Sequence, residues 1–486
     1  MAGIGFRLQK LFQEDYYSSR IKAYGFSLFV TAGPWIVVIV AITAIRYILS
    51  LFHTISIEEQ RLFTISISYC FIFSQIIYGA LQLTVTRYVA DLLYDQKVDR
   101  VFSSFLGMTK ITLLFALILW GAFAFFTPLP ISYKLMMLFL FLTLNIIWIQ
   151  SVYLTAAKDY KSITLAFLIG TCFSFGGILL ISYFHLTITL EHGAAFLLLT
   201  AFSFGTFITL IWLSVVLIKL FPNSDKTEQF TFLSYLDRYP ELFWTGFLYN
   251  IGIWVCNFVI WFGEGRGNIE NSFLYNQVYD TAVFWSYLSI IPTYFLFVVS
   301  IETRFYERYK KFFGAINNGG TLKVILQLKE SMNTVLRQEM ERILRKQGIF
   351  SLSLIFIIGI FISQAGEIAL QYSILQLTII GAFANGMVLV VTLLLLYFED
   401  RTGACRTSVL FFFMNLLLTI LLLPLGFNGY GISFAVGSSI SLLYALARLF
   451  NYTKDIDFHT FCKPGSQKKE RVFFTKLADR LNGKNS

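Results

Sequence analysis

The sequence predicts an all-α polytopic membrane protein, with about twelve transmembrane helices in two pseudo-symmetric six-helix halves. Two compositional figures support this fold class: 57% of the 486 residues are hydrophobic and only 14% are charged. Soluble domains carry about 25% charged residues, and a soluble chain this apolar would expose too much apolar surface to water. The composition therefore excludes a soluble enzyme, a nucleic-acid-binding protein and a disordered chain.

The third observation is that the apolar residues gather in runs of about 20, enough to cross a hydrocarbon core about 30 Å thick. No cleavable signal peptide is expected, because the first run is longer than a signal core and begins only after residue 26. The predicted spans are 27–50, 62–85, 104–126, 134–157, 163–184, 193–218, 242–262, 281–301, 349–366, 373–397, 408–425 and 430–450.

Lys and Arg are placed asymmetrically between the spans, by roughly tenfold in favour of alternate segments. Because cytoplasmic segments collect these residues, the bias places both termini in the cytoplasm. The external segments then hold only Arg61, Lys134 and Arg266. The same rule accounts for the net charge of +10, so no nucleic-acid partner is expected.

Two short motifs recur at nearly one offset and predict an internal repeat. Gly33-Pro34-Trp35 matches Gly252-Ile253-Trp254 at 219 residues, and Thr86-Arg87-Tyr88 matches Thr303-Arg304-Phe305 at 217. Many transporters are built from such repeats. The predicted organisation is a cytoplasmic interfacial helix 1–26, a first half 27–218, a cytoplasmic linker 219–241, a second half 242–451 with a cytoplasmic amphipathic loop 302–348, and a basic cytoplasmic tail 452–486. The alternative for residues 1–26 is a leader helix packed on the first span.

No pattern for catalysis or metal binding is present in the sequence. There is no G-x-x-x-x-G-K-[ST] loop, no Ser-His-Asp arrangement and no H-E-x-x-H. The five cysteines form no C-x-x-C, and the glycine-rich segment from Gly263 to Gly267 is typical of a turn. We therefore expect no enzymatic activity, no cofactor and no metal.

Uncharged polar residues lie deep in the predicted spans, where charged residues are scarce. Amides hydrogen-bond hydroxyl-rich ligands, and aromatic rings offer apolar faces to sugars. The alternative is that the amides hold helices together and that tryptophans mark the membrane interface. The candidate substrate path consists of Gln75, Asn145, Gln150, Asn250, Asn257, Asn385, Asn415, Trp35 and Trp254.

Two further groups of charged residues are candidates for function. Arg87 and Arg304 follow the second span of each half, and they define a candidate cytoplasmic gate of Arg87, Asp91, Glu302 and Arg304. The alternative is that these arginines only anchor the spans. An amphipathic helix after Gly319-Gly320 suits either the membrane surface or a partner. Its candidate docking residues are Lys329, Arg337, Arg342 and Arg345.

Several stretches resemble the PelG family, the transporter subunit of the Pel exopolysaccharide system. They are residues 1–8, Gly33-Pro34-Trp35, Thr86 to Asp91, and a long match from Tyr279 through Pro292 to Phe305. The resemblance implies a twelve-span bacterial inner-membrane protein of the polysaccharide flippase and MATE-like superfamily, acting in biofilm formation. It also implies a cytosolic PelF-like glycosyltransferase, PelD-like and PelE-like membrane partners including a cyclic di-GMP-binding subunit, and an amino-sugar-rich polymer.

The residues and the resemblance together predict a non-enzymatic conduit for a growing exopolysaccharide, delivered by the glycosyltransferase. A flippase for a lipid-linked oligosaccharide is the alternative, and a non-transporting assembly scaffold is the second. A lipid diphosphate would favour basic residues deep in the cavity, so their scarcity argues against the flippase.

Overall fold

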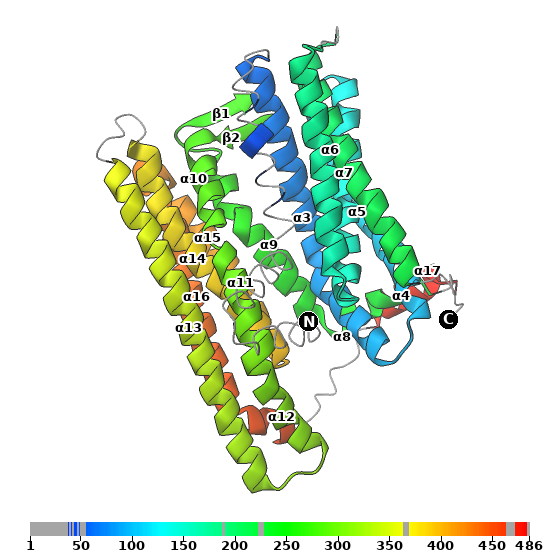
Figure 1. The fold of residues 1–486 in the computed structure, drawn as a ribbon, viewed down its shortest axis with the longest axis vertical. Helices are drawn as coiled ribbons and strands as arrows, with labels where there is room; N and C mark the ends of the chain where they lie inside the picture. Colours follow the sequence, from blue (N-terminus) through cyan, green and yellow to red (C-terminus); the bar gives the residue numbers. More distant parts are fainter. Residues whose placement is uncertain are drawn as a thin grey trace, which may run out of the picture. The chain divides into compact units, whose positions relative to one another are not determined.

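The computed structural model describes residues 55–186, 190–221, 228–362, 369–462 and 472–483, together with residues 37, 40, 43–45 and 48. Nearly all elements in these ranges are helices (Figure 1). The helices are α3 Ile57–Tyr94, α4 Asp99–Phe126, α5 Ile131–Ala156, α6 Tyr160–Tyr183, α7 Gly193–Leu220, α8 Ser234–Arg238, α9 Pro240–Ile260, α10 Gln277–Leu288, α11 Ile291–Val299, α12 Tyr306–Asn317, α13 Leu322–Ile362, α14 Ala369–Tyr397, α15 Arg401–Leu422, α16 Ile432–Lys454 and α17 Phe473–Leu481.

Shorter elements connect these helices. The single-turn η1 covers Thr231–Leu233, η4 covers Leu423–Gly429, and two π-helical segments are η2, Ser300–Phe305, and η5, Phe458–Cys462. The strands β1, Arg266–Ile269, and β2, Phe273–Asn276, form a two-stranded sheet.

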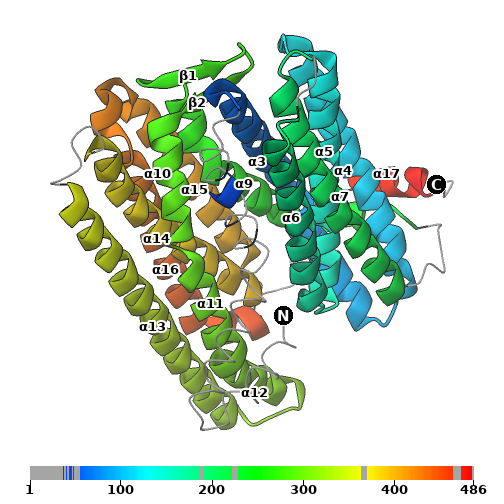
Figure 2. The same ribbon diagram turned by 45° about the horizontal axis from the view of Figure 1, so that its top comes forward.

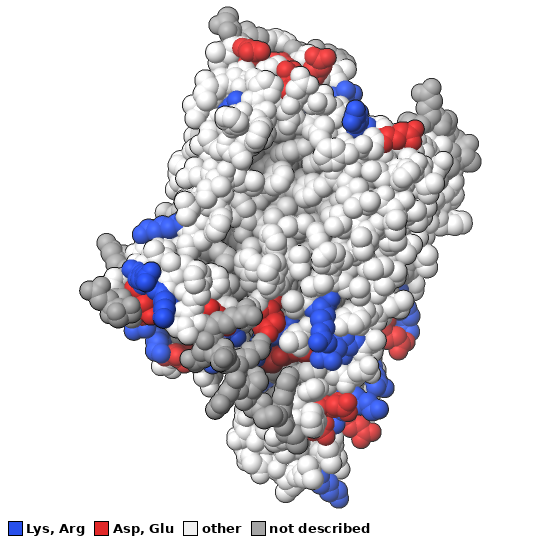
Figure 3. Space-filling view, turned by 180° about the vertical axis from the view of Figure 1, so that it is seen from behind, with Lys and Arg blue, Asp and Glu red and all other residues white. Residues whose placement is uncertain are grey.

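Eleven helical segments in the described part of the chain are long and apolar enough to cross a membrane. Each overlaps one of the predicted spans, and the remaining predicted span, 27–50, lies almost wholly outside the described residues. The predicted fold class, an all-α multi-pass membrane protein, is confirmed. Most of the surface drawn in Figure 3 carries no charged side chains, as expected of helices that face lipid.

In the segment 302–348, a helix begins directly after Gly319-Gly320. This helix, α13, continues without a break from Leu322 to Ile362 over 41 residues. Leu, Lys, Gln, Glu and Arg are good helix formers and dominate its first half, so the polar part propagates directly into the apolar ninth span. Helix α12 packs against α13 (Figure 2).

The described helices fall into two compact units. The N-terminal unit comprises Gly33–Trp254, Arg266–Tyr275 and Lys468–Ser486, and the C-terminal unit includes Val255–Gly265 and Asn276–Gln467. The boundary lies inside α9, beyond the predicted linker 219–241. Residues of η1 and α8 belong to the first unit because their apolar side chains, Phe232, Leu233 and Leu236, are buried in its core.

In the N-terminal unit, small residues allow the helices to approach closely. A Cβ atom on Gly170 of α6 would lie 2.4 Å from the carbonyl oxygen of Gly205 on α7, and the reverse distance would be 2.3 Å. Helices in membranes associate through such small residues, since lipid offers no hydrophobic driving force between them. One core of this unit contains Val85, Met108, Tyr153, Leu213 and Phe232.

In the C-terminal unit, α14 is the central helix and packs against α10, α13, α15 and α16. A Cβ atom on Gly381 would lie 2.4 Å from the Phe434 ring. At the α14–α15 turn, Asp400 caps α15 by accepting a hydrogen bond from the Gly403 amide at 3.1 Å. Arg448 of α16 donates to the same buried carboxylate at 2.6 and 2.9 Å, which joins α16 to this turn.

Candidate functional site

Three of the predicted path residues meet within the N-terminal unit, and we call Gln75, Asn250 and Trp254 the amide cluster. The indole Nε1 of Trp254 donates to Gln75 Oε1 at 3.3 Å, and Gln75 Nε2 donates to Asn250 Oδ1 at 3.4 Å. Gln75 lies on α3, whereas its two partners lie one turn apart on α9. Gln75 and Trp254 are half-buried, whereas Asn250 is buried.

Two glycines bring α3 and α9 together at this point. A Cβ atom on Gly246 would lie 2.3 Å from the carbonyl oxygen of Gly79, and one on Gly79 would lie 2.2 Å from Asn250 Nδ2. Asn250 Nδ2 donates to the Gly246 carbonyl at 2.7 Å. This bond orients the amide of Asn250 so that its oxygen is available to Gln75.

Two aromatic side chains, one from α3 and one from α5, lie beside the part of α3 that carries Gln75. Trp148 of α5 donates through Nε1 to Ser74 Oγ at 3.0 Å and stacks on Tyr78, with ring centroids 6.2 Å apart and an angle of 24°. Neither aromatic residue is among the predicted path residues. Tyr78 follows Gln75 by three residues on one helix, and from this spacing the sequence could have predicted that Tyr78 lies on the same helix face as Gln75.

The structure does not bring Asn145 and Gln150 to the amide cluster. Both are fully buried on α5. Asn145 Nδ2 donates to the Phe141 carbonyl of its own helix at 2.8 Å, and Gln150 Nε2 donates to Ser214 Oγ of α7 at 2.7 Å. The contacts of Gln150 are those expected of an amide that holds helices together.

Three predicted path residues lie in the C-terminal unit, and Trp35 lies outside the described residues. Asn385 and Asn415 are buried on α14 and α15. Asn415 Nδ2 donates to the Phe411 carbonyl at 2.8 Å. Asn257 instead donates through Nδ2 to the Asp280 carboxylate at 2.8 Å.

Asp280 is a polar residue of the spans that the sequence interpretation missed. Its carboxylate also accepts hydrogen bonds from Trp261 Nε1 at 3.1 Å and from the Asn276 amide at 2.9 Å. The bond to Asn276, which caps α10, stabilises the start of that helix. The predicted span began at residue 281, one position too late to include Asp280, although Asp280 lies in the longest family-like stretch.

Each gate arginine has a carboxylate partner inside its own unit. Arg87 Nε lies 3.3 Å from Asp91 Oδ1, and the other oxygen of Asp91 accepts from the Tyr235 hydroxyl at 2.9 Å. Arg304 lies 3.5 Å from Glu339. The side chain of Glu302 is outside the described residues.

The candidate docking residues differ in how firmly they are held. Lys329 pairs with Asp457 at 2.6 Å, and Arg342 binds Glu339 at 2.7 Å. The Arg337 guanidinium lies 5.8 Å from the centre of the Phe450 ring. Arg345 is 65% exposed and has only a loose pair with Glu341 at 3.7 Å.

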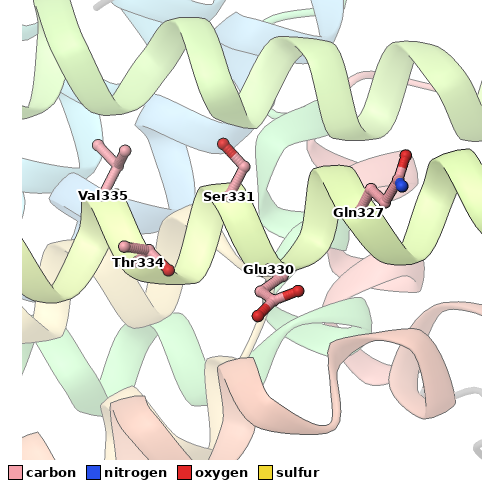
Figure 4. A pocket seen from close by; sticks show the side chains of 5 residues that line it. All are labelled: Gln327, Glu330, Ser331, Thr334 and Val335. Carbon is pink, nitrogen blue, oxygen red and sulfur yellow. The ribbon is translucent and has the colours of Figure 1, made fainter.

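An open pocket of about 350 Å³ lies on one face of α13 between these positions (Figure 4). Its lining residues are Gln327, Glu330, Ser331, Thr334 and Val335. Their spacing of three and four residues places them on one side of the helix. The amphipathic part of α13 therefore carries a polar face beside the candidate docking residues.

Solved structures of MATE transporters resemble this fold. An outward-facing multidrug resistance MATE transporter of the MOP superfamily is 12% identical, with a TM-score of 0.57, over 89% of this chain and 96% of that chain. A MATE transporter in complex with MaL6 is also 12% identical, with a TM-score of 0.59, over 90% and 97% of the two chains. A MOP superfamily transporter from Pyrococcus furiosus Vc1 is 12% identical, with a TM-score of 0.56, over 89% of this chain and 96% of that chain.

At this level of identity, the solved structures show the fold alone. The comparison with curated proteins finds no match. The comparison with protein families is more specific, because the model of the PelG family, described as exopolysaccharide exporters (EPS-E), matches residues 1–461. This match covers most of the 486 residues, and the chain therefore belongs to the PelG family of exopolysaccharide exporters.

Proposed function

We propose that this protein is a non-enzymatic conduit in the bacterial inner membrane, with both termini in the cytoplasm. It exports a growing, amino-sugar-rich exopolysaccharide of the Pel type, which a cytosolic PelF-like glycosyltransferase delivers. Family membership supports the export of a polysaccharide. The observation that carries the finer proposal is the amide cluster of Gln75, Asn250 and Trp254, bordered by aromatic rings.

The chemistry of the amide cluster suits a neutral polymer that must move past it. Amides offer donors and acceptors to hydroxyl and N-acetyl groups, and the half-buried indoles of Trp254 and Trp148 add apolar surface. A typical hydrogen bond contributes only about 0.5–1.5 kcal/mol net. Weak contacts of this size orient successive sugars without trapping the chain.

The partners are part of the same proposal. The helices α12 and α13 form the docking region for the glycosyltransferase, and Arg345 is more exposed than Lys329 and Arg342. PelD-like and PelE-like membrane subunits, one of which binds cyclic di-GMP, complete the assembly. Charge reversal at Arg345 is expected to reduce co-purification of the glycosyltransferase, whereas unchanged co-purification would remove this surface from the proposal.

A flippase for a lipid-linked oligosaccharide is the second candidate. It is favoured by the fold, because solved neighbours include MATE transporters in outward-facing and inward-facing conformations. Alternating access of this kind moves one bound molecule per cycle. A flippase needs a complete lipid-linked substrate, whereas the conduit needs a working glycosyltransferase on the cytoplasmic side.

The test is reconstitution of the protein in vesicles with its glycosyltransferase and sugar nucleotide, followed by measurement of polymer inside and outside. Gln75→Leu keeps a side chain of similar size and Trp254→Phe keeps an aromatic ring, but both remove the hydrogen bonds of the cluster. We expect the translocated fraction to fall about tenfold, as for the loss of one or two hydrogen bonds.

The matched control is Gln376→Leu, which removes a glutamine amide bonded to the Ile355 carbonyl at 2.9 Å in the other unit. It should leave translocation near the wild-type value. Wild-type translocation in both cluster variants would remove the amide cluster from the proposed path. No translocation by the reconstituted wild-type protein would favour a scaffold that transports nothing. Translocation of a preformed lipid-linked oligosaccharide without the glycosyltransferase would favour the flippase.

A further inference from the structure

The last described helix, α17, is held on the N-terminal unit by polar bonds at both ends. At its start, the Thr475 amide and hydroxyl donate to Asp237 Oδ2 of α8 at 2.7 and 2.9 Å. At its end, Asn482 accepts from the Phe230 amide at 2.9 Å. An isolated helix of nine residues is only marginally stable in water. These bonds to the N-terminal unit therefore stabilise α17 at this place.

Only part of the apolar surface of α17 is used for this attachment. Ala478 is buried, and Phe474 packs beside it against the core that contains Phe232 and Leu233. A second row remains outside: Phe473 is 70% exposed, Leu477 37% and Leu481 48%. These three follow one another at intervals of four residues, so they form one exposed stripe along the helix.

Positive charge borders the exposed stripe on the side away from the attachment. Lys476 and Arg480 are exposed, and each precedes a stripe residue by one position. On a helical wheel, the order is therefore attached face, exposed apolar stripe, basic edge. This is the pattern of helices that lie in the surface of a membrane, with the apolar face at the acyl boundary and Lys or Arg near anionic headgroups.

The surroundings of α17 in the same unit fit a membrane surface. The helix is drawn across the direction of α4 and α7 in Figure 2. It packs against α8 and η1, immediately before α9 begins at Pro240. The helices before and after η1 and α8 in the sequence carry exposed Lys219, at the end of α7, and exposed Trp244, in the second turn of α9. Both residue types are common near the membrane interface.

We propose that α17 binds the cytoplasmic membrane surface and selects anionic phospholipids. Phe473, Leu477 and Leu481 enter the boundary between headgroups and acyl chains, and Lys476 and Arg480 contact lipid phosphates. The helix lies beyond residue 461, where the match to the family ends. The proposed lipid contact therefore lies outside the matched region and is independent of the proposed transport path.

The first experiment identifies what touches the stripe. A photoreactive benzoylphenylalanine replaces Leu477 in the full-length protein, which is cross-linked in native membranes and analysed by mass spectrometry. We expect phospholipid adducts, as from the same probe at the exposed Phe115 of α4. The matched control is the same probe at Asp479, on the opposite side of α17, which should give few phospholipid adducts. Protein adducts at position 477, or no lipid adducts, would overturn the proposal.

The second experiment tests the selection of anionic lipid. The full-length protein is placed in nanodiscs of phosphatidylcholine, with or without phosphatidylglycerol, and hydrogen exchange of residues 473–482 is measured. We expect exchange about 10- to 30-fold slower with phosphatidylglycerol, as for two basic residues at an anionic surface. Lys476→Gln with Arg480→Gln should abolish the difference, whereas Lys97→Gln, at an exposed lysine elsewhere in the unit, should not. Equal exchange rates in the two lipids would refute lipid selection.

Discussion

At the scale of single residues, Arg87 and Arg304 are held by carboxylates of their own units. Asp91 pairs with Arg87 and also accepts the hydroxyl of Tyr235. Glu339 is only 4% exposed and binds both Arg304 and Arg342. An arginine that served only as a positive anchor would need neither partner, since the charge alone satisfies the topology rule.

A substitution to lysine therefore separates an anchor from a gate. Arg87→Lys and Arg304→Lys keep the charge but lose the forked geometry that a carboxylate prefers. If these residues close the cytoplasmic entrance, both variants should insert normally yet reduce export severalfold or let small ions leak. Polymer output and membrane permeability are the measurements. Normal export with an intact permeability barrier in both variants would leave only the anchor role.

At the scale of elements, the contact between α3 and α9 depends on two glycines. The Cβ atom of Gly246→Ala would lie 2.3 Å from the backbone oxygen of Gly79, and a backbone atom cannot rotate away. We expect this variant to lower the free energy of unfolding by about 1–3 kcal/mol and to reduce export, because the amide cluster separates.

The matched control for this prediction is Gly121→Ala on α4. No atom lies within 4 Å of a Cβ atom at that position, so alanine should be neutral or stabilise the helix by about 0.5–1 kcal/mol. Thermal unfolding in detergent compares the two variants. A Gly246→Ala protein as stable as Gly121→Ala would show that the two helices do not depend on this approach.

An ion pair between Lys329 and Asp457 joins α13 to the segment after α16. The ammonium of Lys329, hydrogen-bonded to Asp457, holds the pKa of that carboxyl below its usual range. Because the folded pKa lies below the unfolded value of about 3.9, the stabilisation is complete above that value. It is lost as the pH falls through the folded pKa.

We therefore expect the segment around Asp457 to detach from α13 under acid conditions and not near neutral pH. Hydrogen exchange of this segment between about pH 3 and pH 6 measures the effect, after correction for intrinsic exchange. Asp457→Asn should show the weakened contact at every pH. A wild-type profile identical to that of Asp457→Asn would contradict the role of the ion pair.

At the scale of the whole molecule, the distribution of Lys and Arg determines how the chain is inserted. Single cysteines near Lys134 and Arg266 should react with an impermeant reagent added to intact cells. Cysteines near Lys97, Lys329 and Lys469 should react only after the membrane is opened. External labelling within residues 302–348 would overturn the predicted orientation, because the most basic segment would then lie outside.

The amino-acid sequence determined the places of eleven helical spans in the described part of the chain, because membrane insertion depends on hydrophobicity summed over about 20 neighbouring residues. It also selected Gln75, Asn250 and Trp254 as deep polar residues. It did not show that Gln75 bonds to residues 175 and 179 positions away, because that contact depends on how α3 and α9 pack.

Only the tertiary structure decided which polar residues share a site and which merely hold helices together. It placed Gln150 between α5 and α7, and it paired Asp280 with Asn257 and Trp261. It also showed that the start of α17 is hydrogen-bonded to Asp237, a residue 238 positions before Thr475 in the chain. These outcomes depend on close packing and on hydrogen bonds between distant segments, and local hydrophobicity carries no information about either.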